Sequence, residues 1–192
     1  MSDEAYGGAV GAFPYAFRTS DSRLFRLYVV LAAVLTALSI VFFLFALAFW
    51  VAQTLGQSPV AALSRAFLIL IWLAVVAPVI APVLLVARRH RRGRPVDHRY
   101  DVALAATGFL YVLAVYVGLL IGAPADARGT PTGAVAPVVE TLYAMPRWAG
   151  AVPPLAVVAA MYLAHWTLGR APADADVDGR SGDDDRPGDA PE

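Results

Sequence analysis

The side chains that could do chemistry in this chain are its three histidines and the aspartates that lie near two of them. His90, Asp97, His98 and Asp101 fall close together, and His165 lies much further along the chain. Imidazole and carboxylate groups bind metal ions and transfer protons. Their spacing here matches no metal-binding motif, so we expect no metal site, no cofactor and no catalytic residue.

A second group of candidate ligands lies in the acidic segment 170–192. Asp174, Asp176, Asp178 and Gly179 match the opening of a calcium-binding loop, and Asp185 occupies its twelfth position. Such a loop normally closes with glutamate and is flanked by amphipathic helices, both of which are missing here. We interpret 170–192 as a disordered cytoplasmic tail, because it has almost no apolar side chains to bury. Calcium binding by this tail stays open.

An arginine-rich segment, RRHRRGRPVDHR, occupies residues 88–99. Such clusters bind anionic lipid headgroups or acidic partners, or serve only to orient a membrane protein. We favour the orienting role and keep lipid contact as the alternative. Nucleic-acid binding is not expected from so short a segment. The candidate lipid contacts are Arg88, Arg89, Arg91, Arg92 and Arg94.

Four long apolar segments surround these charges, and hydrophobic residues make up 59% of the chain. They lie at 24–51, 66–87, 102–123 and 150–168. About 20 apolar residues suffice to cross the hydrocarbon core as a helix. We therefore predict an all-α bundle of four transmembrane helices, with an N-terminal segment at 1–22 and a membrane domain at 23–169.

The distribution of arginine predicts the orientation of this bundle. All 15 basic residues are arginine. With the N-terminus inside, the segments near 18–26, 88–99 and 170 face the cytoplasm, and only Arg65, Arg128 and Arg147 lie outside. Cytoplasmic loops carry the excess of basic residues. We therefore expect both termini in the cytoplasm of a multi-pass cell-membrane protein.

Small residues at four-residue spacing predict how the helices pack, because they let helix backbones approach closely in lipid. Two such rows, in the third and fourth segments, are expected to contact each other. They are Ala114, Gly118 and Gly122, and Ala156, Ala160 and Ala164. Pro78 and Pro82 should kink the second segment, either as a static bend or as a broken helix of the kind that transporters use.

The longer external loop, 124–149, contains a patch of apolar residues. Val138, Val139, Leu142 and Tyr143 lie roughly on one helical face. The pattern fits a short interfacial helix, and an irregular loop fits about equally well.

Three segments resemble a known family: YAFRTSDSRLFRLYVV, APVLLVARRHRR and DHRYDVALAATGFLYVLAVYVGLLI. Together they are similar to a family of small, uncharacterised four-helix membrane proteins of halophilic archaea, over about residues 15–170. The resemblance implies membrane location. It implies no activity and assigns no functional residue.

The cores of the four apolar segments contain no Asp, Glu or Arg. Ionisable residues at membrane depth mark proton relays and ion pathways, so their absence argues against a proton-coupled carrier or an intramembrane enzyme. We expect a non-enzymatic scaffold or accessory subunit that contacts lipid, another membrane protein or itself. A small oligomeric transporter or channel is the alternative.

Overall fold

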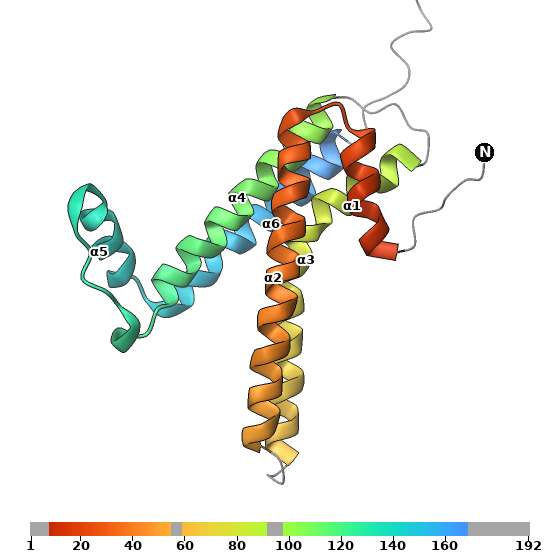
Figure 1. Cartoon of the computed structure of the whole chain (residues 1–192). Coiled ribbons are helices and arrows are strands. Elements are labelled where there is room, and N and C mark those ends of the chain that lie inside the picture. Colours follow the sequence, from red (N-terminus) through yellow and green to blue (C-terminus); the bar gives the residue numbers. More distant parts are fainter. Residues whose placement is uncertain (1–7, 55–58, 92–97, 169–192) are drawn as a thin grey trace, which may run out of the picture.

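The computed structural model describes residues 8–54, 59–91 and 98–168, and all secondary structure in these residues is helical (Figure 1). The four long helices expected from the apolar segments are present. They are α2 (Arg23–Thr54), α3 (Pro59–Arg91), α4 (His98–Gly122) and α6 (Val152–Leu168). With α6 extended by the turn at Arg147, all four are long and apolar enough to cross a membrane.

The long helices form two hairpins that meet at one end and diverge at the other (Figure 1). One hairpin is α2 with α3, and the other is α4 with α6. We call the end where α2 and α4 begin and α3 and α6 end the joined end. Away from it the hairpins separate, so many large apolar side chains have no protein neighbour and are exposed.

The hydrophobic core lies at the joined end, where all four long helices contribute. Its fully buried large side chains come from α2, α3 and α4: Phe25, Tyr28, Val83, Val86, Tyr100 and Leu104. Val157 and Met161 add the contribution of α6. The core therefore holds the two hairpins together at this end.

A further helix, α1 (Gly8–Thr19), covers the end of α3 (Figure 1). No helix was predicted within the N-terminal segment 1–22. Ala12 and Ala16 of α1 are fully buried in the core, because their small side chains allow a close approach. Ser22 caps the first long helix, because its Oγ accepts a hydrogen bond from the Phe25 N–H at 3.3 Å.

The connection between α4 and α6 contains short helices: η1 (Ala125–Ala127), η2 (Gly133–Val135), α5 (Ala136–Ala144) and η3 (Arg147–Ala151). The apolar patch of this loop is thus helical, as one of the two interpretations held. Proline near the start of α5 suits the first helical turn, which needs no backbone donor. The Arg128 guanidinium lies 5.1 Å from the centre of the Tyr143 ring. This contact holds α5 against the end of α4.

The contact between α4 and α6 differs from the predicted one. Gly118 approaches the backbone of Gly150 so closely that a Cβ on either residue would meet the other's carbonyl oxygen. Ala114 is buried in the core. The Gly122 backbone nitrogen lies 3.3 Å from the position of a Cβ on Gly150, but a Cβ on Gly122 itself would meet nothing within 4 Å. The residues that face α4 are Gly150 of η3 and Pro154, Val157 and Met161 of α6. We call this row the seam.

The predicted row on the fourth segment is wrong for this contact. Ala156 and Ala160 are exposed, and Ala164 is only half-buried. Successive residues in an α-helix are rotated by about 100°, so this row lies one position away from the seam that contains Val157 and Met161. A helix that is apolar all round does not reveal from composition which row faces its neighbour.

Several sequence-based predictions concern residues outside the described ranges. These are Arg92 and Arg94 of the arginine-rich segment, Asp97, and the acidic tail 170–192 with its calcium-like spacing.

Candidate functional site

Polar side chains from every long helix meet at the joined end. They come from the α1–α2 junction, the last turn of α3, the first turn of α4 and the last turn of α6. We call them the polar cluster: Ser20, Arg89, His90, Tyr100, Asp101 and His165. A group of ionisable side chains within apolar helices is the part of such a protein most indicative of function.

Asp101 is the centre of the polar cluster and is only 3% exposed. The hydroxyl of Ser20 donates a hydrogen bond to its Oδ2 at 2.6 Å. His90 Nε2 lies 3.4 Å from the same oxygen. A carboxylate is costly to bury without such partners. Asp101 therefore ties the α1–α2 junction and α3 to the start of α4.

The second carboxylate oxygen of Asp101, Oδ1, is buried and has no hydrogen-bond partner among the described residues. A buried acceptor without a donor is uncommon. Among the described residues, the buried Thr36 Oγ1 shares this condition.

Local contacts hold Ser20 in place at the junction of α1 and α2. Its Oγ accepts a hydrogen bond from the Ser22 N–H at 3.3 Å. Its carbonyl oxygen accepts one from Arg26 Nε at 2.8 Å. The turn between the helices thus fixes the direction in which the Ser20 hydroxyl points toward Asp101.

The other half of the polar cluster joins α3, α4 and α6. The Tyr100 hydroxyl lies 2.7 Å from Nδ1 of His165. The Arg89 guanidinium carbon lies 4.3 Å from the centre of the Tyr100 ring, a cation–π arrangement. Arg89 also donates to the carbonyl oxygen of Leu168 at 3.3 Å, where a cation favours the helix C-terminus. These contacts bring the end of α6 to α3 and α4.

The four metal-site candidates among the described residues, His90, His98, Asp101 and His165, are not brought together as a group. His90 faces Asp101, His165 pairs with Tyr100, and His98 is exposed. No three His, Cys, Asp or Glu side chains within the described ranges are placed to hold a metal ion. The geometry is that of a structural network.

The cluster also lacks the arrangement of a serine nucleophile. Ser20 donates its proton toward a carboxylate, but both Ser20 and Asp101 are buried, so a substrate has no access to the hydroxyl. Nucleophilic catalysis needs an activated hydroxyl that can reach the substrate.

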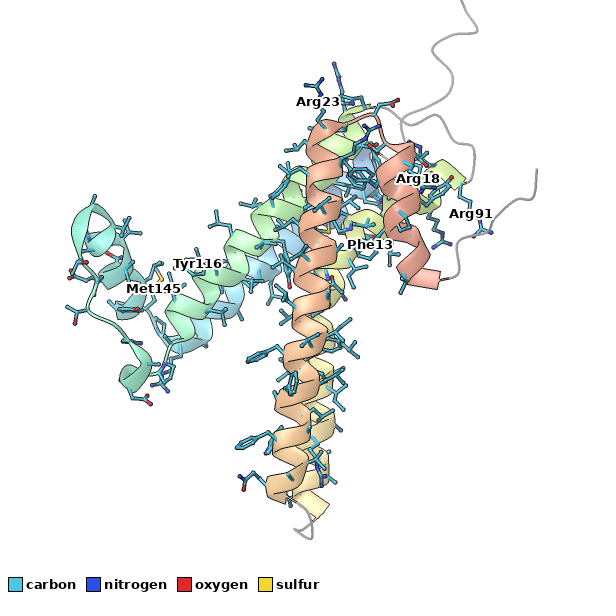
Figure 2. The ribbon with its side chains drawn as sticks, in the orientation of Figure 1. Phe13, Arg18, Arg23, Arg91, Tyr116 and Met145 are labelled. Carbon is cyan, nitrogen blue, oxygen red and sulfur yellow. The ribbon has the colours of Figure 1, made fainter. Side chains whose placement is uncertain are left out.

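The described arginines of the 88–94 segment fall into two classes. Arg88 and Arg91 are exposed, whereas Arg89 is half-buried in the polar cluster. The Arg89 guanidinium packs on Tyr100 and bonds to the Leu168 carbonyl, while lipid contact by Arg88, Arg89 and Arg91 stays a prediction. Figure 2 shows Arg91 at the joined end together with Arg18 and Arg23, while Met145 lies beside α5 at the far end of the other hairpin.

The kink residues Pro78 and Pro82 lie inside α3, near two buried tyrosines. Tyr28 of α2 donates its hydroxyl to the carbonyl of Val79 at 2.6 Å. Tyr111 of α4 donates to the carbonyl of Val75 at 2.9 Å. No sequence pattern pairs a side chain with a distant backbone carbonyl.

A cavity of about 190 Å³ lies beside this kink, between α2, α3 and α4. Six of its lining side chains are apolar, and Thr36 and Ser39 add hydroxyl groups. The Ser39 hydroxyl is already bonded to the Trp72 indole N–H at 2.8 Å. The Thr36 hydroxyl is buried without a hydrogen-bond partner among the described residues. One such hydroxyl among apolar side chains falls well short of the six or more oxygen ligands that an ion such as Ca²⁺ takes.

Comparison with known proteins adds a family but no activity. No curated protein and no solved structure matches the chain. One family model, the domain of unknown function DUF8056, matches residues 1–169, which include every described helix. The match leaves out the acidic tail, as the resemblance drawn from the sequence also does. The chain therefore belongs to the DUF8056 family.

Proposed function

We propose that this protein is a non-enzymatic accessory subunit or scaffold of the cell membrane, which packs against a partner membrane protein. The polar cluster is the observation that carries the proposal. Its groups bond to one another and to helix ends, with Ser20, Tyr100 and Asp101 buried and Arg89, His90 and His165 half-buried. Most of their hydrogen-bonding capacity is used between helices, which supports a role in holding the helices together.

The outer half of the α2–α3 hairpin is the surface best suited to the partner. It exposes large aromatic side chains, with Phe42 at 77%, Phe45 at 73%, Phe49 at 69% and Phe67 at 62%. Aromatic side chains supply much of the binding energy where proteins associate. In a membrane such a face contacts either lipid or another protein's helices.

The positive-inside rule supports placing the joined end at the cytoplasmic face. Exposed arginines at this end include Arg18, Arg23, Arg88 and Arg91. Arg88 and Arg91 then lie where anionic headgroups are found, and Arg92 and Arg94 follow them in the sequence. Lipid contact by these arginines is part of the proposal, with the effect per residue of about 1 kcal/mol that basic residues near an anionic surface show.

Site-specific photo-crosslinking in native membranes tests the proposal. A photoreactive residue replaces Phe45 or Phe67 on the outer α2–α3 hairpin. As a control it replaces Leu119, which is similarly exposed on α4 at 68%. We expect one discrete protein adduct of the same mass from Phe45 and Phe67, absent from Leu119.

Two outcomes would contradict the accessory role. Lipid adducts alone at all three positions would show that no partner protein contacts this surface. An adduct between two copies of this chain would instead favour the oligomeric transporter or channel.

A further inference from the structure

Helix α3 contains two breaks in its hydrogen bonding, one turn apart. Pro78 and Pro82 have no backbone N–H, so the carbonyls of Ala74 and Pro78 lose their usual donors within the helix. Their rings also push the helix apart on that side, which bends it. In Figure 1, α3 runs beside α2 and then turns away beneath α1.

The two tyrosine hydroxyl groups bond to the helix at equivalent positions. Tyr111 donates to the carbonyl three residues before Pro78, and Tyr28 to the carbonyl three residues before Pro82. Each is the carbonyl next to one that proline has left without a donor. The same relation at both prolines indicates that the tyrosines stabilise the bent form of α3.

The tyrosines belong to different hairpins, Tyr28 to α2 and Tyr111 to α4. Tyr28 fits tightly, because its ring fills the space that a Cβ on Gly108 of α4 would occupy. Its ring also meets Phe109 edge-on, with centroids 5.3 Å apart. The bend in α3 is thus held from both sides at the point where the hairpins diverge.

Beyond the bend, each hairpin has its own internal contacts. In the first, Trp72 of α3 bonds to Ser39 of α2 and stacks on Phe43, with ring centroids 4.4 Å apart. In the second, Gly118 of α4 lies against Gly150. These contacts join the helices within each hairpin, so each can move as a unit.

Free space lies where such a movement would need it. Protein interiors are close-packed, and helices can shift only where volume is available. The cavity of about 190 Å³ lies between α2, α3 and α4, and Val75 and Val79 form part of its wall. These are the residues whose carbonyls accept the tyrosine hydrogen bonds.

We propose that the Pro78–Pro82 segment is a pivot about which the outer α2–α3 hairpin changes its angle to the α4–α6 hairpin, and that Tyr28 and Tyr111 latch the observed bent form. The function proposed above does not require this movement. Removing both hydroxyl groups should raise the population with a changed hairpin angle, relative to the observed bent form, roughly tenfold. This is the combined effect of losing two ordinary hydrogen bonds.

The absence of native cysteine makes the test direct. Cysteines replacing Leu63 of α3 and Leu119 of α4, exposed at 72% and 68%, carry spin labels in reconstituted lipid nanodiscs. Double electron–electron resonance then measures the distance between the hairpins. We expect Tyr28→Phe/Tyr111→Phe to add or enlarge a second distance population. Tyr116→Phe, which removes a hydroxyl from an exposed tyrosine of α4, should leave the distribution unchanged.

The same tyrosine substitutions are repeated in a Pro78→Ala/Pro82→Ala background, with helix content checked by circular dichroism. There we expect no further change, because an unbent α3 would no longer present the Val75 and Val79 carbonyls to the two tyrosines. The proposal is overturned if the tyrosine substitutions leave the distribution as it is in the wild type. It is also overturned if they act equally with and without the prolines, since the hydroxyl groups would then stabilise packing in general.

Discussion

Asp101 is the residue on which the joined end depends most. One of its oxygens receives the Ser20 hydroxyl and faces His90, and the side chain is buried against four helical segments. Removing one member of a buried polar pair costs more than the pair contributes, because the remaining groups stay buried without partners.

We expect Asp101→Ala to lower the free energy of unfolding by about 2–4 kcal/mol. Asp101→Asn keeps an acceptor for Ser20 and should lose about 1 kcal/mol. Titration with a denaturing detergent, followed by circular dichroism, measures both values. Asp126→Asn, on the exposed loop after α4, is the control. Equal stability of Asp101→Ala and this control would show that the polar cluster does not hold the helices together.

Gly108 gives a second test at the scale of one residue. A methyl group there would overlap the ring of Tyr28, whereas Gly122 on the same helix has open space. We expect Gly108→Ala to destabilise the protein by about 1–3 kcal/mol, as overpacking of a core does. Gly122→Ala should be neutral or stabilising by up to about 1 kcal/mol. The same detergent titration compares them, and the reverse order of stability would contradict the fit of Tyr28.

These contacts between side chains could not be predicted from the sequence. Ser20 and Asp101 are separated by 81 positions, and Tyr100 and His165 by 65. Neither pair has a spacing that a motif could reveal, because the contact depends on how four helices are placed. The sequence did single out His90, Asp101 and His165, together with Asp97 and His98, as side chains that could do chemistry, but it did not pair them.

At the scale of helices, the four long helices were predicted correctly from the sequence, because the thickness of a membrane determines how long an apolar helix must be to cross it. Long apolar segments must become helices in lipid, since no other backbone arrangement except a closed barrel satisfies its own hydrogen bonds. The rotation of each helix about its axis was not predictable in the same way. Helix α6 is apolar on all sides, so the row of alanines and the seam containing Val157 and Met161 were equally plausible contacts.

The seam between α4 and α6 is tested by substituting the two glycines whose backbones approach each other there. We expect Gly118→Ala and Gly150→Ala each to lower stability by about 1–3 kcal/mol, because the added Cβ forces the backbones apart. Since both changes disturb one contact, the double variant should lose less than the sum of the two. Thermal unfolding in detergent measures the losses.

Ala160→Leu is the control for this seam, since Ala160 is exposed on α6. It should change stability by less than about 0.5 kcal/mol. A large loss for Ala160→Leu with none for Gly118→Ala would restore the alanine row as the contact.

At the scale of the whole molecule, two hairpins share one core and one polar cluster and separate beyond them (Figure 1). This arrangement concentrates specific contacts at the joined end and leaves broad apolar faces elsewhere. A membrane would supply the surroundings such faces need, and the distribution of arginine predicts the orientation. The proposed subunit role and the pivot both depend on four helices crossing the membrane with the joined end inside.

Cysteine accessibility in intact cells measures this arrangement most directly, because the chain contains no native cysteine. Single cysteines replace Asp21 and His98 at the joined end and Thr130 in the connection between α4 and α6. A membrane-impermeant maleimide should label Thr130→Cys in intact cells, and Asp21→Cys and His98→Cys only after the membrane is permeabilised. Labelling of Asp21→Cys or His98→Cys in intact cells, or protection of Thr130→Cys until lysis, would contradict the account.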